Sequence, residues 1–337
     1  MDTLPDNSTI LLSRTDSIGD VVLTLPMAGY LKSHFPKCRI VFLGRRYTRD
    51  VVALSEHVDH FVDYDEIKTL SENEQVSRLV ALKIDYVFHV YPRKEIALLA
   101  DKAGISTRVG TMSRLYHWYT CNRKIHLPRK NSRQHEATLN LKMLGVFGLP
   151  LPALETIQGY YGFTHLPVLP DNLLALVNGQ DKINLILHPH SKGSAREWGL
   201  KNFNDLIERL PEEKYKVFIS GTDEEGKDLG ELFIRHPNIT NLCGKMHLKE
   251  FIAFINACDA MVAASTGPLH IAAALGKKAI GLYAPMRPIH PGRWKPLGPK
   301  AIALALDKKC EDCKTSKDCH CIREIRPEEV LTSLENL

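Results

Sequence analysis

The sequence lacks any long hydrophobic run. Its longest apolar stretches, at 260–264 and 271–275, are far shorter than the ~20 residues that a helix needs to cross a bilayer. Residues 1–9 carry Asp2 and Asp6 and have no basic segment ahead of their short apolar run, unlike a secretory signal. We therefore expect a cytoplasmic protein without a transmembrane segment.

The glycine-rich fingerprint of dinucleotide-binding proteins is also missing. After the first β-rich run, residues 16–20 read DSIGD, with a single glycine and an acid where a pyrophosphate would lie. This absence argues against a dinucleotide-dependent oxidoreductase.

The eight cysteines form neither a disulfide framework nor a strong zinc motif. Four of them are scattered through apolar or mixed segments, as buried reduced thiols are: Cys38, Cys121, Cys243 and Cys258. The other four are close enough together for a structural zinc but are not spaced as two C-x2-C pairs: Cys310, Cys313, Cys319 and Cys321. We expect no cofactor and no catalytic metal, and structural zinc in the tail stays open.

What the sequence does contain is a regular alternation of β-rich runs and helical patterns. With 337 residues, the chain exceeds what one hydrophobic core organises, so two domains are expected. The strands are predicted at 9–14, 39–43 and 86–90 in the first half and at 182–188, 215–220, 258–264 and 278–282 in the second. Such alternation is typical of parallel sheets, so we predict an α/β fold of two Rossmann-like, doubly wound domains.

A segment rich in proline and glycine, at 148–180, separates the two halves. We place the boundary at Pro170, which gives domains over 1–170 and 171–322. Residues 323–337 contain a short helix that we expect to pack back on the first domain. Because Rossmann-like sheets bind ligands at the carboxyl ends of their strands, we expect the chemistry in the strand-to-helix loops, facing a cleft between the domains.

The first informative loop, RTDSIGD at 14–20, leaves a strand and enters a helical pattern at Asp20. A carboxylate at a helix start can cap the helix, or it can act as a general base that takes a proton from an acceptor hydroxyl. Spacing alone leaves both readings open. We predict Asp20 as the catalytic residue, with Ser17 and Gly19 in the adjoining acceptor site, and we expect Pro26 to kink the helix.

A second loop, ASTGPLH at 264–270, ends a buried strand and begins a helix. Backbone N–H groups and the positive end of the helix dipole make such a helix start suitable for a diphosphate. A tight turn with a capping hydroxyl, and a core position for the histidine, are the alternatives. The residues predicted to bind a phosphorylated donor here are Ser265, Thr266, Gly267, Pro268 and His270.

A third loop, HPHSKGSAREW at 188–198, follows the first strand of the second half and is basic. Lys192 and Arg196 could neutralise a departing diphosphate in place of a metal ion, although surface loops often carry such charges without a ligand. Together with Ser191, these two residues complete the predicted donor site.

Residues 108–135 contain no acidic residue, although the net charge of the whole chain is only +5. Basic side chains alternate here with aromatic ones, a combination that can hold phosphates, an acidic glycolipid head group or nucleic acid. Nucleic acid is the weaker candidate because the overall charge is low and no nucleic-acid-binding motif is present. A solvated loop without a ligand is the plain alternative. The predicted acceptor-binding residues of this stretch are Arg108, Arg114, Arg123 and Lys124.

In combination, these motifs resemble glycosyltransferase family 9, the lipopolysaccharide heptosyltransferase family. The resemblance lies in RTDSIGDV at 14–21 with TLP at 24–26, in the 188–198 loop that ends in REW, and in STGPLH at 265–270 followed by AAALG at 272–276. The order and separation of the motifs match from near residue 10 to about residue 285.

The resemblance implies a GT-B fold and a metal-independent, inverting transfer from a donor such as ADP-heptose. The acceptor would be an anionic, lipid-linked saccharide of the lipopolysaccharide core type, bound by the N-terminal domain, with the nucleotide sugar bound by the C-terminal one. Position by position, Asp20 matches the family's catalytic aspartate, Arg196 the basic residue that contacts the donor phosphates, and Thr266-Gly267 with His270 the diphosphate loop. We expect a monomer with peripheral contact to the inner face of the inner membrane.

Two departures from the family pattern concern the donor. The family often carries aspartate where this chain has Ser265 and glycine where it has His190, and a carboxylate there could contact the donor sugar. Another nucleotide sugar therefore stays open as the donor. A nucleotide-sugar epimerase of similar fold is the second alternative, but it would need no acceptor surface, so the basic stretch favours a transferase.

Overall fold

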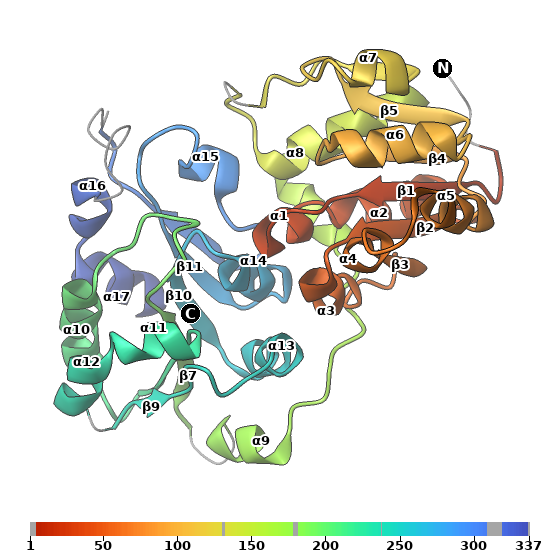
Figure 1. The fold of residues 1–337 in the computed structure, drawn as a ribbon. Coiled ribbons are helices and arrows are strands. Elements are labelled where there is room, and N and C mark those ends of the chain that lie inside the picture. The colour runs from red at the N-terminus through yellow and green to blue at the C-terminus, as the bar shows by residue number, and fades with distance from the viewer. Residues whose placement is uncertain (1–4, 130–131, 178–180, 237, 309–318, 336–337) are drawn as a thin grey trace. The chain divides into compact units, whose positions relative to one another are not determined.

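A computed structural model describes residues 5–129, 132–177, 181–236, 238–308 and 319–335 of the chain. The chain divides into two compact units, Met1–His165 and Leu166–Leu337 (Figure 1). The division falls within the segment rich in proline and glycine, shortly before the boundary predicted at Pro170. Each unit is a parallel sheet with helices around it, so the predicted α/β, doubly wound class is confirmed.

Unit 1 contains one six-stranded parallel sheet in the order β3-β2-β1-β4-β5-β6. Its strands are β1 (Thr9–Ser13), β2 (Arg39–Gly44), β3 (His60–Asp63), β4 (Tyr86–His89), β5 (Thr107–Thr111) and β6 (Arg123–Ile125). Every residue of β1 is buried, because a central parallel strand is covered on both faces. On one face, Leu11, Val41 and Val87 meet Ile96 and Leu99.

Most helices of unit 1 lie in the crossovers that connect its parallel strands. They are α1 (Ile18–Val22), α2 (Pro26–His34), η1 (Arg46–Thr48), α3 (Arg49–Val52), α4 (Tyr64–Ile67), α5 (Glu72–Ala81), α6 (Lys94–Lys102), α7 (His117–Thr120), α8 (Glu136–Leu141), η3 (Lys142–Phe147) and η4 (Leu154–Tyr160). Pro26 divides the predicted first helix in two: α1 ends at Val22 and the proline occupies the first turn of α2, where a missing N–H is tolerated.

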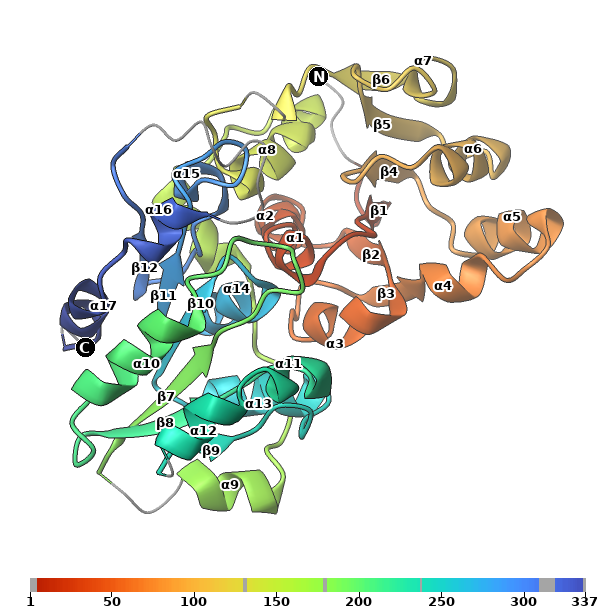
Figure 2. The same ribbon diagram turned by 60° about the vertical axis from the view of Figure 1, so that its left-hand side comes forward.

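Unit 2 repeats the topology with the order β12-β11-β10-β7-β8-β9. Its strands are β7 (Ile183–His188), β8 (Tyr215–Ile219), β9 (Thr240–Asn241), β10 (Ala260–Ala264), β11 (Lys278–Leu282) and β12 (Ala301–Leu304). Its helices are α9 (Asp171–Val177), α10 (Leu200–Arg209), α11 (Asp223–Lys227), α12 (Gly230–Arg235), α13 (Leu248–Ala257), α14 (Gly267–Ala274), α15 (Pro291–Trp294), α16 (His320–Arg323) and α17 (Pro327–Glu335). Figure 2 shows the same elements in a turned view.

The C-terminal helix α17 belongs to unit 2, so the expectation that it packs back on the first domain is wrong. It packs against α10 and β11. Val330 and Leu334 are fully buried in the core of unit 2, because they form one apolar stripe on the helix. Just before the helix, the carbonyl of Ile325 accepts a hydrogen bond from the Trp198 indole at 2.8 Å.

The helices carry no membrane-spanning segment within the residues that the structure describes, because none there is long and apolar enough to cross a bilayer.

Candidate functional site

The predicted functional loops all leave the carboxyl edge of a sheet at the point where the strand order reverses. In unit 1, β1 pairs with β2 on one side and with β4 on the other, and the 14–20 loop follows β1. In unit 2, β10 pairs with both β7 and β11, the 188–198 loop follows β7 and the 264–270 loop follows β10. Such switch points are where doubly wound sheets bind ligands. Each unit therefore carries its own candidate site.

The Asp20 carboxylate is held by two different donors. Ser17 is the N-cap residue of α1 and Asp20 is the third residue of the helix, so the reading of Asp20 as the cap is wrong. One oxygen of Asp20 accepts a hydrogen bond from the Ser17 hydroxyl and the other accepts one from the Arg14 guanidinium. The side chain is 18% exposed, so it stays accessible to a substrate.

Arg14 is a buried cation surrounded by carboxylates. Its side chain is only 3% exposed; its Nε lies 2.7 Å from Asp16 and its Nη1 lies 3.1 Å from Glu136. Burial disfavours the charge, but Asp20, Asp16 and Glu136 more than offset this and raise the pKa of Arg14 above its usual value. Arg14 therefore remains charged and fixes the position of the Asp20 carboxylate.

Helix α8 supports this cluster from behind. The Asn140 amide donates to the Thr24 hydroxyl at 3.1 Å, and that hydroxyl donates to the Asp20 carbonyl at 2.8 Å. Arg129 pairs with Glu136 and lies 2.9 Å from the Asn140 side-chain oxygen. These contacts lock α1 against α8, so the orientation of Asp20 depends on residues more than a hundred positions away in the chain.

Asp16 is a second acid in this loop, and the sequence did not single it out. Burial is the main cause that raises its pKa, to about 6; Arg14 lowers the pKa and Asp20 raises it further. Arg93, which follows β4, donates to the Thr15 hydroxyl at 2.6 Å and so ties together the two loops at the switch point.

The predicted acceptor-binding residues do not all meet. Ser17 and Gly19 lie with Asp20 at the start of α1. Arg108 lies near the beginning of β5, where its guanidinium donates to the Thr120 carbonyl at 2.6 Å and pairs with Asp101 at 2.8 Å. These partners hold Arg108 within the scaffold of unit 1, so we do not retain it as an acceptor contact.

The other three basic residues lie at the β6 end of the strand order, away from the start of α1. Arg123 and Lys124 are on β6, the edge strand, and Arg114 is in the loop after β5. They surround α7 rather than the start of α1.

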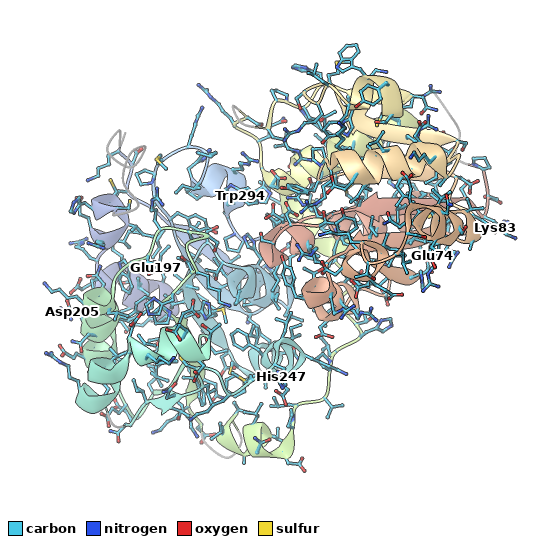
Figure 3. The ribbon with its side chains drawn as sticks, viewed as in Figure 1. Glu74, Lys83, Glu197, Asp205, His247 and Trp294 are labelled. Carbon is cyan, nitrogen blue, oxygen red and sulfur yellow. The ribbon has the colours of Figure 1, made fainter. Side chains whose placement is uncertain are left out.

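In unit 2, Glu197 organises the loop after β7, and Figure 3 labels it just ahead of α10. Its carboxylate accepts hydrogen bonds from the Ser191 backbone N–H at 2.8 Å and from the Ser191 hydroxyl at 2.9 Å, and it lies 3.3 Å from Nδ1 of His190. Lys192 adopts a left-handed conformation with φ of 49° and its side chain is exposed, while Arg196 is half-buried. Ser191 therefore shapes the loop, and Lys192 and Arg196 carry its charge.

The loop after β10 presents a helix start without a side-chain cap. Thr266 is the N-cap residue of α14, makes no cap hydrogen bond, and its buried hydroxyl has no partner in the structure. The first N–H groups of a helix have no partner within the helix, and Pro268, in the first turn, has no N–H. The free donors of this turn are therefore the N–H groups of Gly267 and Leu269. Ser265 forms a side-chain hydrogen bond with Tyr283. This helix start offers N–H groups, a hydroxyl and a positive dipole end to an anion.

His270, one turn into α14, is almost fully buried. An exposed fraction of 2% fits a histidine that is part of the hydrophobic core, and it equally fits one that supports the 264–270 loop from beneath.

Among the residues that the structure describes, no three His, Cys, Asp or Glu side chains form a group that could hold a metal ion. Cys310 and Cys313 lie outside the described residues. Cys319 and Cys321 are buried in the core of unit 2.

Comparison with known proteins decides the family. The model for glycosyltransferase family 9 (heptosyltransferase) matches residues 88–321, more than half of the chain. The chain belongs to glycosyltransferase family 9. The predicted resemblance is thereby confirmed, and the protein is a glycosyltransferase. The match begins after the Asp20 loop, so the role of that loop is argued from its geometry.

Relatives of this family 9 glycosyltransferase cover nearly its whole length. Lipooligosaccharide heptosyltransferase 2 of Campylobacter jejuni is 23% identical over 332 residues, which span 95% of this chain and 96% of that protein. A solved family 9 glycosyltransferase from Veillonella parvula gives a TM-score of 0.82 at 19% identity, over 99% of this chain and 98% of that one. The Escherichia coli heptosyltransferase WaaC, solved with ADP, gives a TM-score of 0.74 at 17% identity, over 97% and 99% of the two chains. These similarities confirm the GT-B class of fold.

Proposed function

We propose that this family 9 glycosyltransferase transfers a heptose from ADP-heptose to an anionic, lipid-linked saccharide of the lipopolysaccharide or lipooligosaccharide core, with inversion and without a metal ion. The named relatives support the choice of sugar and acceptor, since the C. jejuni protein is a lipooligosaccharide heptosyltransferase and the E. coli enzyme was solved with ADP. The observation that carries the proposal is one candidate site at the switch point of each unit: an oriented carboxylate in unit 1 and an uncapped helix start in unit 2.

Asp20 is the proposed general base. The Arg14 guanidinium fixes one carboxylate oxygen and the Ser17 hydroxyl orients the other, so the carboxylate meets an acceptor hydroxyl in a defined direction. It takes the hydroxyl proton as the oxygen attacks the anomeric carbon from the face opposite the diphosphate. The carbon–oxygen bond to the donor phosphate breaks in the same displacement, which inverts the configuration.

The donor diphosphate is proposed to bind at the start of α14. The Gly267 and Leu269 N–H groups and the Thr266 hydroxyl would hydrogen-bond its oxygens. Lys192 and Arg196, on the loop after β7, would offset the negative charge that grows on the diphosphate as it leaves. Two cations and a helix dipole supply the stabilisation that a divalent ion provides in other transferases.

Calorimetric titration with ADP, UDP, GDP, NAD and ADP-heptose, first without metal and then with EDTA, tests the donor. We expect ADP and ADP-heptose to bind equally well under both conditions. Preference for UDP or GDP would leave a transferase with a different sugar, and binding of NAD alone would overturn the proposal.

A second assay tests the reaction itself, by following ADP release from ADP-heptose with and without a lipopolysaccharide core acceptor. We expect release to require the acceptor. Conversion of the donor sugar in the absence of any acceptor would instead indicate a nucleotide-sugar epimerase.

A further inference from the structure

Exposed hydrophobic side chains gather on one short segment of unit 1, which follows β5. We call this the α7 surface: Met112, Leu115, Trp118 and Tyr119, whose exposed fractions are 43, 85, 57 and 61%. The other large hydrophobic side chains that are exposed among the described residues are spread singly or in pairs along the chain. Single exposed apolar residues need no explanation, but a cluster of this kind marks an interaction site.

The α7 surface is built on an ordered scaffold. His117 and Thr120 point into unit 1 and are fully buried, which turns the intervening Trp118 and Tyr119 outward. The His117 ring accepts a hydrogen bond from the Thr111 backbone N–H at 2.9 Å, and the Trp118 indole donates one to the Met112 carbonyl at 3.2 Å. Figures 1 and 2 both show α7 beside β5 and α6, which it contacts. The apolar side chains are therefore held outward by packing beneath them.

The segment that carries this surface is basic, and the two acids of the neighbouring helix α6, Glu95 and Asp101, are each paired with an arginine. Arg114 and Arg123 are exposed, and the Lys124 ammonium lies 5.6 Å from the centre of the Trp118 ring. No acidic residue occurs from 108 to 135. Aromatic rings mixed with basic side chains are the composition found at the head-group level of membranes, where the rings enter the interface and the cations meet lipid phosphates.

The α7 surface begins at the same edge of the sheet as the Asp20 loop. Met112 directly follows β5, and β5 is two strands from β1 in the parallel sheet. Parallel strands end at a common edge, so a contact made at this edge lies on the side of unit 1 where the acceptor would be bound.

We propose that the α7 surface docks on an anionic bilayer, with Leu115, Trp118 and Tyr119 entering the head-group region and Arg114 and Arg123 contacting lipid phosphates. Docking would present a membrane-embedded acceptor to Asp20, and this last consequence rests on the proposed function. A second copy of the chain fits less well, because two surfaces of the same charge would then face each other.

Flotation of the purified full-length chain with vesicles tests the proposal. Vesicles of phosphatidylcholine alone are compared with vesicles that contain about one quarter phosphatidylglycerol, at low and high salt. The variant L115S/W118S removes the apolar contact, and V80S/V168S is the matched control, because Val80 and Val168 are 53 and 91% exposed but lie elsewhere. We expect the wild type and the control to bind the anionic vesicles, and L115S/W118S to bind about tenfold more weakly or worse.

The charge is tested separately with R114Q/R123Q and the control K68Q/K83Q, which removes two exposed lysines from the same unit. Binding to anionic vesicles should fall by about fivefold for each arginine removed and change little in the control. Equal loss of vesicle binding in R114Q/R123Q and K68Q/K83Q would mean that net charge alone drives binding. Equal binding of L115S/W118S and its control V80S/V168S would overturn the proposal.

Four further measurements complete the test. Self-association of the wild type without lipid that is lost in L115S/W118S would assign the surface to a second copy and refute the membrane proposal. Binding of single-stranded RNA in place of vesicles would also refute it. Thermal unfolding of each variant checks that it is folded.

Turnover of L115S/W118S should be normal with a short water-soluble saccharide and low with an acceptor embedded in vesicles. Absence of all turnover in the wild type would refute the proposed function, while vesicle binding would still decide the docking surface.

Discussion

At the scale of the residue, the Asp20 carboxylate is oriented by a buried cation that is itself surrounded by acids. Asp20 is partly exposed while Arg14 is buried, so the proposed base faces outward and the group that positions it faces inward. This arrangement would separate two tasks: the proposed proton transfer at Asp20 and maintenance of geometry by Arg14, Glu136 and Arg129. The two tasks can be tested by different measurements.

Replacement of Asp20 by asparagine keeps the size of the side chain and removes its basicity. We expect turnover to fall by about 10²–10⁴-fold, because no group then accepts the acceptor proton. The dissociation constant for ADP, measured by calorimetry, should stay near the wild-type value since the donor loop is in unit 2. Normal turnover together with weakened ADP binding would refute the assignment of Asp20 as the base.

Glu136→Gln should lower the free energy of unfolding by about 3–5 kcal/mol, because it leaves the buried Arg14 and the neighbouring Arg129 without their shared carboxylate. Urea denaturation measures this change. Lys102→Gln, in an ion pair whose two side chains are 50 and 67% exposed, is the control and should change stability by less than about 1 kcal/mol. Similar small effects in both variants would show that the cluster does not hold α1 in place.

At the scale of the element, the start of α14 has an unusual combination of burial and unused hydrogen-bonding capacity. A side chain can cap the first N–H groups of a helix. Here the N-cap hydroxyl of Thr266 is buried and makes no bond, so the helix start is unsatisfied in the protein alone. An unsatisfied buried group costs stability, and a bound anion would remove that cost.

Thr266→Val is therefore expected to separate stability from binding. It removes a hydroxyl that has no partner, so the free energy of unfolding should stay the same or rise slightly. Affinity for ADP should fall by about tenfold or more, because a hydrogen bond to a charged oxygen is lost. Urea denaturation and calorimetry measure the two quantities. A loss of stability with unchanged ADP affinity would mean that the hydroxyl serves the fold and not the donor.

The sequence could predict which loops lie at the carboxyl edge of a sheet, because a loop that follows a parallel strand always lies there. The 14–20, 188–198 and 264–270 loops were found in this way. It could not predict that Glu136 and Asn140 meet Arg14, since no local pattern encodes which distant helix packs behind a loop. The partners of Arg108 could not be predicted for the same reason: its charge is visible in the sequence, but its pairing with Asp101 is not.

At the scale of the whole molecule, each unit buries a neutral histidine near its switch point. Burial, with a smaller effect of His117, lowers the pKa of His89 at the end of β4 to about 3. Burial likewise lowers the pKa of His188 at the end of β7 to about 4. In the unfolded chain, a histidine takes up a proton as the pH falls through about 6.5. In the folded protein, these two histidines take up a proton only at a much lower pH.

Acid should therefore destabilise the protein. The contribution of each histidine to stability is complete above about pH 6.5 and falls by about 1.4 kcal/mol for each pH unit below it, until the folded pKa is reached. Asp16 opposes part of this loss below about pH 6, because its raised pKa favours proton uptake by the folded state. Urea midpoints of the wild type and His89→Gln between pH 7 and pH 4.5 isolate one histidine: the variant should lose stability less steeply, and parallel curves would contradict the prediction.

The two sheets share one strand order, and the residues proposed to choose the acceptor and the donor come from separate units. On this proposal, substitutions that alter acceptor preference and substitutions that alter nucleotide-sugar preference are expected to fall in different halves of the chain. Evolution can change one specificity while leaving the other intact, and an engineer can recombine halves of two family members near residue 165 to obtain new pairings of donor and acceptor.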